Sequence, residues 1–237
     1  MTERAYLDEL VAALARILGD DLAGVFAGGS WALGGYVPVE SDLDVAAVVR
    51  ARLPRETKHR LVAALRHEAL PCPARGLELV VYTLAAVREP TAEGAYELNL
   101  NTGARMTFRA DEAPVPGDLH WFAIDRAVLR EHGVALLGPP AAEVFAEIPR
   151  ALLLPVLADV VRWYRGGGDR DDAVLNACRA LLFAEEGRWA SKQAAGRWAL
   201  GRVGDEELVA AALAGGSLDT GRVDAFLRPA LARLETQ

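Results

Sequence analysis

The segment over residues 28–44, GGSWALGGYVPVESDLD, combines a glycine pair, a serine, a second glycine pair and two aspartates. It follows a short apolar run, LAGVFA at 22–27, which is typical of a buried strand that ends in a tight turn. At such a turn, glycines let backbone N–H groups approach anionic oxygens closely, and a helix that begins at Ser30 adds its dipole. Gly28, Gly29 and Ser30 are therefore the candidate phosphate cradle.

The same segment leads into a second apolar run, DLDVAAVV at 42–49. The strand period of two puts Asp42 and Asp44 on one face and their apolar neighbours on the other. The two like charges repel strongly if both are dehydrated, so the pair favours a cation between them or free access of water. Carboxylate oxygens are ligands of Mg²⁺, and the pair predicts a divalent-metal site beside the phosphate cradle.

A third carboxylate stands in the run LELVVY at 77–82, which predicts another buried strand. Glu78 is the one charged side chain in that run, and it would share a face with Val80 and Tyr82. On a strand next to the aspartate pair, Glu78 would complete the site. It would act as a further metal ligand or as the base that takes a proton from an attacking hydroxyl.

Each of these features also has an ordinary structural interpretation. Gly-Gly-Ser after a strand is common turn chemistry, and an Asp-x-Asp pair is often a solvated strand end. A lone glutamate in an apolar strand can pair with an arginine, for which Arg105 and Arg109 are available. The order of the three features along the chain favours the catalytic interpretation.

The rest of the chain divides into a mixed N-terminal part and a helical C-terminal part. Helical spacing of apolar residues predicts helices at 2–18, 54–70 and 121–133, and the Gly- and Pro-rich segment 89–120 predicts loops with a strand around 105–109. Gly138-Pro139-Pro140 marks a break, after which we expect helices at 150–165, 171–185, 191–202, 205–214 and 223–234. The sequence therefore predicts an α+β fold, with a mixed-sheet domain at 1–140 and an all-α bundle at 141–237.

Composition excludes several classes of protein. The 237 residues are 52% hydrophobic, which suffices for a packed core, and Cys72 and Cys178 fit neither a disulfide framework nor a four-ligand zinc site. There are 26 basic against 33 acidic residues, a net charge of -7, so no nucleic-acid partner is expected. No apolar run reaches the roughly 20 residues that span a bilayer, and acidic residues stand where a signal peptide would be basic. We therefore expect a cytoplasmic protein without a membrane partner; nothing in the sequence indicates an oligomeric state.

Two sets of motifs carry a resemblance to known proteins. Gly28-Gly29-Ser30, Gly34-Gly35 and Ser41-Asp42-x-Asp44 resemble the signature of the polymerase-beta-like nucleotidyltransferase superfamily. The C-terminal part is similar to the aminoglycoside 3''/9-adenylyltransferases that modify streptomycin and spectinomycin. The motifs that carry this second likeness are Glu131-His132-x-Val134-Ala135-Leu136-x-Gly138-Pro139, Gly168-Asp169, Leu175, Arg179, Gly187, Ser191-Lys192, Ala195 and Trp198-Ala199.

The resemblance implies a polymerase-beta-like nucleotidyltransferase domain followed by an all-helical domain, with the active site in the cleft between them. It also implies a Mg²⁺-dependent reaction in which AMP passes from ATP to a hydroxyl of an aminoglycoside or aminocyclitol, and pyrophosphate is released. Carried over, Asp42, Asp44 and Glu78 bind Mg²⁺, with Glu78 also the catalytic base. Gly29 and Ser30 contact the triphosphate.

The resemblance assigns further roles to the C-terminal part. Arg179 and Lys192 would bind the phosphates of ATP, while Asp169 and Trp163 would face the cationic drug. A cationic substrate would also be attracted by the acidic residues of the poorly patterned segment. These are Glu97, Asp111, Glu112 and Asp118.

Two alternatives keep part of this interpretation. A nucleotidyltransferase of the same fold could act on a protein, a tRNA or another metabolite, although an acidic chain without a basic aromatic stripe argues against tRNA. A catalytically silent nucleotide-binding or antitoxin-like module would retain the fold alone. The presence of all three carboxylates argues against that second alternative.

Overall fold

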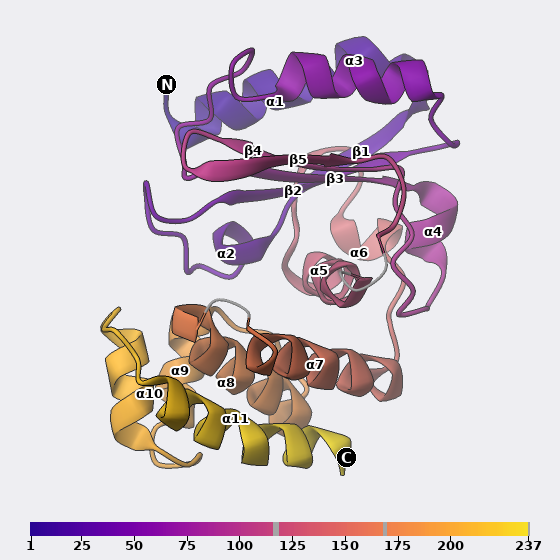
Figure 1. Ribbon diagram of the computed structural model, residues 1–237. Coiled ribbons are helices and arrows are strands. Elements are labelled where there is room, and N and C mark those ends of the chain that lie inside the picture. The colour runs from indigo at the N-terminus through magenta and orange to yellow at the C-terminus, as the bar shows by residue number, and fades with distance from the viewer. Residues whose placement is uncertain (116–118, 168–169, 237) are drawn as a thin grey trace. The chain divides into compact units, whose positions relative to one another are not determined.

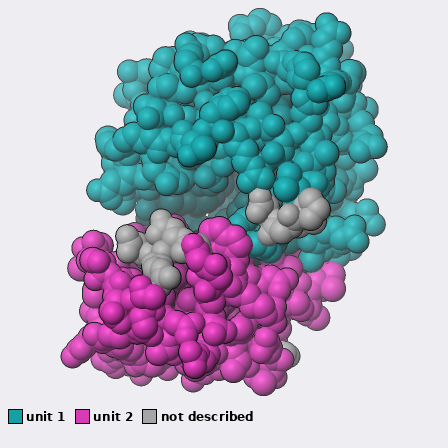
Figure 2. Space-filling view, in the orientation of Figure 1, with its two compact units in different colours: residues 1–147 teal, residues 148–237 magenta. Residues whose placement is uncertain are grey.

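The computed structural model describes residues 1–115, 119–167 and 170–236. It divides into two compact units, Met1–Glu147 and Ile148–Gln237, coloured teal and magenta in Figure 2. The break falls beyond the Gly138-Pro139-Pro140 segment, so the short helix α6 (Ala141–Val144) belongs to the first unit. Each unit has a fold of its own.

The strands of the described residues in the first unit form one six-stranded sheet in the order β5-β4-β3-β2-β1-β6. The pairing is mixed, because β2 and β3 run parallel while β1 and β2, and β3 and β4, are antiparallel. The strands are β1 (Leu22–Ala27), β2 (Leu43–Val49), β3 (Leu77–Thr83), β4 (Leu98–Gly103), β5 (Met106–Asp111) and β6 (Val134–Leu137).

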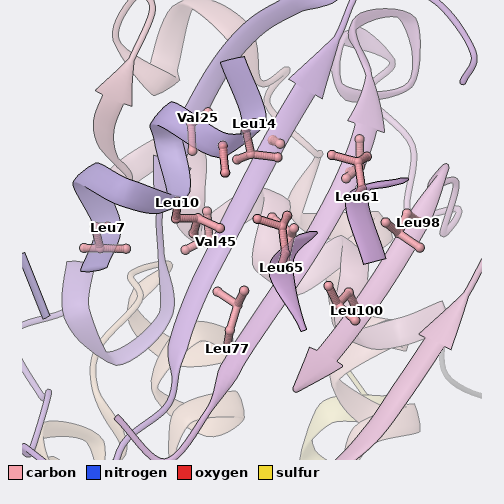
Figure 3. Packing of buried hydrophobic residues seen from close by; sticks show 14 of the residues in the cluster. Leu7, Leu10, Leu14, Val25, Val45, Leu61, Leu65, Leu77, Leu98 and Leu100 are labelled. Atoms are coloured by element: carbon pink, nitrogen blue, oxygen red, sulfur yellow. The ribbon is translucent and has the colours of Figure 1, made fainter. Parts of the chain in front are cut away.

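Helices cover both faces of this sheet (Figure 1). On one face lie α1 (Glu3–Leu18) and α3 (Arg55–Leu65), whose leucines interdigitate with alternate residues of the strands (Figure 3). On the other face lie α2 (Gly29–Ala32), α5 (Leu119–His132) and α6. The remaining helical segments of this unit are η1 (Gly19–Asp21) and α4 (Leu84–Arg88).

The period of two along β2 and β3 sorts their side chains between two cores. Val45 and Leu79 belong to the core under α1 and α3, whereas Ala46, Val48 and Tyr82 belong to a second core on the opposite face. Burial of apolar side chains on both faces explains why these central strands read as nearly continuous apolar runs. A polar side chain on either strand must therefore lie near a strand end or displace core packing.

The second unit is helical throughout its described residues, as the loss of alternating patterns after residue 140 predicts. Its helices are α7 (Arg150–Arg165), α8 (Arg170–Glu186), α9 (Lys192–Ala199), α10 (Glu206–Leu213) and α11 (Thr220–Glu235). Ser191, Asp205 and Asp219 cap three of these helices by accepting hydrogen bonds from backbone N–H groups. The predicted α+β class, a mixed-sheet domain followed by a helical one, is confirmed.

Several local predictions are wrong. The helix expected over 54–70 ends at Leu65, because Arg66 turns to an extended backbone and the next N–H, of His67, donates to the Thr102 hydroxyl. Strand β4 lies where loops were expected, and β6 lies between a predicted helix and a predicted break, where no strand was expected. The first alternates leucine with asparagine inside a Gly- and Pro-rich segment that favours loops. The second is apolar, but it is a four-residue edge strand with mostly exposed side chains and is too short to show a period.

In the described residues, no helix is both long enough and apolar enough to cross a membrane.

Arg126 on α5 is buried almost completely, with 2% of its surface exposed. Its guanidinium donates to the carbonyl oxygens of Ala86 (3.0 Å), Thr91 (2.6 Å) and Glu93 (2.8 Å). Burial lowers the pKa of Arg126, yet these carbonyls satisfy its donors and compensate for lost hydration. One side chain thus fixes the chain between α4 and β4 against α5.

Arg126→Met should lower the free energy of unfolding by roughly 3 kcal/mol or more, because it leaves three carbonyl oxygens without their donor. Arg130→Met is the matched control, since Arg130 donates to the Ala142 and Phe145 carbonyls from a more exposed position one turn later. It should cost about 1 kcal/mol. Urea unfolding, followed by amide hydrogen exchange in β3 and β4, measures both. Equal losses would contradict the special role of Arg126.

Candidate active site

The parallel pairing of β2 with β3 places two carboxylates side by side. Asp44 and Glu78 are partners in this register, and both side chains are partly buried. Their neighbours Val45 and Leu79 point into the core under α1 and α3, so the carboxylates lie on the opposite face of the sheet. The third predicted carboxylate, Asp42, comes just before β2, with 19% of its side chain exposed. The structure therefore brings together the acidic residues that the sequence singles out.

The glycine turn lies directly against this pair. The Gly28 N–H donates to the Asp44 carbonyl oxygen at 2.8 Å, which joins the turn to β2. Gly29 has a φ of +49°, and a Cβ on it would stand 1.7 Å from Asp44 Oδ2. Only glycine fits there, because any side chain would occupy the position of the Asp44 carboxylate. The predicted helix follows at once as α2, a single turn that begins at Gly29.

Ser30 is the polar side chain of this turn. Its Oγ is buried, and no hydrogen-bond partner for it lies among the residues that the structure describes. A buried hydroxyl without a partner costs free energy unless a ligand or water supplies the bond. The hydroxyl is a donor as well as an acceptor, and it can bind a phosphate oxygen.

Arg75 enters the site without a signal in the sequence analysis. Its Nη2 donates to Asp42 Oδ2, and its backbone N–H donates to the Ser41 carbonyl at 3.0 Å. Arg75 stands two residues before β3, which pairs with the strand that follows Asp42. A charged residue just ahead of the strand that carries Glu78 is the sequence signal from which Arg75 could have been predicted.

Glu78 carries the largest electrostatic perturbation in the site. The pKa of Glu78 is raised from an ordinary value of 4.5 to about 8, chiefly by burial and further by the charges of Asp42 and Asp125, while the charge of Arg75 opposes the rise. Asp125 lies on α5 as an exposed residue, and sequence reasoning missed it as well. Because the pKa is higher in the folded state, ionisation of Glu78 opposes folding. The contribution of Glu78 to the free energy of unfolding therefore falls as the pH rises from about 4.5 to about 8.

The proposed arginine partners of Glu78 make other contacts. Arg105 donates to the Val39 carbonyl oxygen, and Arg109 pairs with Asp111 at 2.5 Å. The cation whose charge acts on Glu78 is Arg75. Glu78 is thus part of an acidic cluster rather than one half of a simple ion pair.

The acidic residues expected to attract a cationic substrate have other partners. Glu97 is only 5% exposed, and its carboxylate pairs with Lys58 at 3.1 Å, so the expectation is wrong for this residue. Glu112 pairs with Arg55 at 3.2 Å. Asp118 lies outside the described residues. The carboxylates of Glu97 and Glu112 pair with basic residues on and beside α3 instead of forming an open acidic surface.

Within the second unit, the two predicted phosphate-binding cations lie on the packed helices α8 and α9. Arg179 Nη1 donates to Asn176 Oδ1 at 3.2 Å, and Lys192 pairs with Asp172 at 2.6 Å. Trp163 is 42% exposed near the end of α7 and packs edge-on against Tyr164. Asp169 lies outside the described residues.

The donor set of the first unit fits a hard divalent cation, because Asp42, Asp44 and Glu78 all offer carboxylate oxygens. Across the residues that the structure describes, no three acidic, histidine or cysteine side chains stand close enough to enclose a metal together. Asp42 instead faces the guanidinium of Arg75. The cradle at Gly29, into which no Cβ fits beside Asp44, and the unpartnered Ser30 hydroxyl are the features that match a metal-bound phosphate.

Comparisons with known proteins identify relatives of this chain. Residues 143–215 match the family described as aminoglycoside adenylyltransferase, C-terminal domain. An aminoglycoside (3'') (9) adenylyltransferase of Klebsiella pneumoniae is 31% identical over 209 residues, which cover 83% of this chain and 78% of that relative. A spectinomycin 9-adenylyltransferase of Staphylococcus aureus (strain Mu50 / ATCC 700699) is 24% identical over 192 residues, 78% of this chain and 73% of that relative.

Among solved structures, the spectinomycin adenyltransferase AAD(9) from Enterococcus faecialis, crystallised with ATP and spectinomycin, has the same fold. The TM-score is 0.74 at 16% sequence identity, over 99% of this chain and 100% of that one. The relative that is 31% identical is an adenylyltransferase, and this chain, which has the same two-part fold as AAD(9), is a nucleotidyltransferase. It belongs to the aminoglycoside (3'') (9) adenylyltransferase family.

Gly29→Ala should abolish most nucleotidyl transfer, because its Cβ must displace the Asp44 carboxylate. A misplaced catalytic group commonly costs on the order of 100-fold in rate. Gly34→Ala is the matched control, since Gly34 also has a positive φ (+66°) but a Cβ there meets nothing within 4 Å. Both variants should lose about 1 kcal/mol of stability from backbone strain. Thermal unfolding and pyrophosphate release measure the two effects, and equal activity in both variants would contradict the role of Gly29.

Proposed function

We propose that this chain transfers AMP from ATP to a hydroxyl group of an aminoglycoside or aminocyclitol, such as streptomycin or spectinomycin, and releases pyrophosphate. The observation that carries the proposal is the pairing of Asp44 with Glu78 beside the Gly29 turn, in a chain of this family. The relatives named for spectinomycin, one of them solved with ATP and spectinomycin, support the choice of substrates.

Asp42 and Asp44 are the proposed Mg²⁺ ligands, with Glu78 as a further one. Mg²⁺ bound there would neutralise the charge that develops on the phosphate oxygens as the bond to pyrophosphate breaks. Asp44 is suited to this role because the Gly28 N–H and the close approach of Gly29 fix its position against the turn. Ser30 would donate its hydroxyl to a phosphate oxygen and so acquire the partner it lacks.

Glu78 is the proposed base. As the acceptor oxygen attacks the α-phosphorus, its O–H proton passes to the Glu78 carboxylate, and the α-phosphorus–oxygen bond breaks with its electron pair leaving on pyrophosphate. A pKa of about 8 keeps the carboxylate basic enough to accept this proton near neutral pH. Cations bound nearby would lower that pKa and increase the ionised fraction.

The second unit supplies the remaining proposed groups. Arg179 offers a planar fork and Lys192 a point charge, and both suit the triphosphate of ATP. Trp163, exposed on α7, and Asp169 are the proposed contacts to the cationic sugar. Asp125, the exposed acid whose charge acts on Glu78, would add to the attraction for a cation. Since the reaction consumes ATP, we place the enzyme in the cytoplasm.

Incubation with ATP, Mg²⁺ and either streptomycin or spectinomycin tests this function, with mass spectrometry of the drug and pyrophosphate release as readouts. At least one drug should gain a single adenylyl group, and Asp44→Asn, which removes a proposed metal ligand, should reduce the rate by a factor on the order of 100 or more. If both drugs remain unmodified, the proposed acceptor, streptomycin or spectinomycin, is wrong. Modification of an added protein or of RNA would indicate a nucleotidyltransferase with another acceptor.

A further inference from the structure

The guanidinium of Arg75 lies in the acidic cluster, beside carboxylates that are proposed to bind a metal ion. Its guanidinium donates to Asp42, and its charge also acts on Glu78, so it lies near two of the proposed metal ligands. The Arg75 side chain is 46% exposed, whereas that of Asp42 is 19% exposed. The pair therefore joins a half-exposed arginine to a partly buried carboxylate.

The backbone under Arg75 is fixed while its side chain reaches solvent. The Arg75 N–H donates to the Ser41 carbonyl at 3.0 Å, and the Leu43 N–H donates to the Gly76 carbonyl at 2.9 Å. On its other side, a Cβ on Gly103 would stand 2.5 Å from the Arg75 carbonyl oxygen, so β4 also packs closely against this backbone. A guanidinium on a long, half-exposed side chain can leave Asp42 without any change in the strands.

A divalent cation and a guanidinium cannot both contact one carboxylate without strong mutual repulsion. Entry of a cation at Asp42 must therefore expel Arg75 or be weakened by it. The fork of an arginine matches phosphate oxygens as well as it matches a carboxylate. A nucleotide that arrives with the cation offers the displaced guanidinium a new anionic partner.

We propose that Arg75 is an exchangeable counterion, which neutralises Asp42 in the free enzyme and moves to the phosphates when a divalent cation binds Asp42 with the nucleotide. This inference rests on the metal site of the proposed function. Its consequence is coupling between two ligands, because the cation alone must displace Arg75 into water, whereas the cation with nucleotide displaces it onto an anion. Free metal should bind weakly, and nucleotide should strengthen its binding.

The test measures Mn²⁺ binding by water-proton relaxation, first without nucleotide and then with a non-hydrolysable ATP analogue. Arg75→Gln should bind Mn²⁺ alone about 5-fold or more tightly than the parent, and the strengthening by the analogue should shrink by a similar factor. Arg75→Lys, which keeps the charge but not the fork, should remain close to the parent without nucleotide. Arg105→Gln is the control for loss of an exposed arginine, since Arg105 donates to a backbone carbonyl, and it should match the parent.

The outcomes separate this inference from the function on which it rests. If parent and Arg75→Gln bind Mn²⁺ alone equally, or if Arg75→Gln binds it more weakly, Arg75 is not a competing cation and the inference fails while the metal site stands. If Asp42→Asn binds Mn²⁺ with the analogue as tightly as the parent does, the metal site itself is wrong and both proposals fall. Thermal unfolding of each variant confirms that the compared proteins are folded.

Discussion

Repulsion among carboxylates at the end of the β2–β3 pair is the interaction on which the rest of this site depends. The parallel register places Asp44 beside Glu78, and Asp42 precedes the same strand, so three like charges occupy one corner of a largely apolar sheet. Such a cluster persists only when protons, fixed cations or a bound metal neutralise it. The raised pKa of Glu78, which favours its protonated form, and the ion pair of Arg75 with Asp42 are two of these means.

Neutralisation in the free protein also prepares the chemistry. A glutamate held near its titration point can accept a proton, and a carboxylate fixed against the Gly29 turn can receive a metal together with a phosphate. The close approach of Gly29 to Asp44 leaves no room for another side chain, so the candidate phosphate cradle and the proposed metal ligand form one unit. The buried hydroxyl of Ser30 at the same turn has no hydrogen-bond partner among the described residues and can bind a ligand.

The sequence predicts those parts of the molecule that repeat a local pattern. The apolar runs of β1, β2 and β3 and the leucine stripe of α1 carry clear periods, and Asp44 and Glu78 stand out because each interrupts such a run. Strand β4 was missed although its leucines alternate with asparagines, because the Gly- and Pro-rich segment around it favours loops. The local signal for Arg75 is no more than its place just ahead of β3, and Asp125 has none, because strand register and the packing of α5 bring the two residues close to Glu78.

Neutralisation of the carboxylate cluster is tested by NMR titration of the Glu78 carboxyl group, in glutamate-labelled protein and with Glu78→Gln to assign the resonance. In the free protein Glu78 should titrate with a pKa of about 8. Addition of Mg²⁺ with a non-hydrolysable ATP analogue should lower that pKa, because a cation beside the carboxylate favours its ionised form. A pKa near the ordinary 4.5 in the free protein, with no response to the metal and nucleotide, would show that burial and the neighbouring carboxylates do not hold Glu78 in its protonated form.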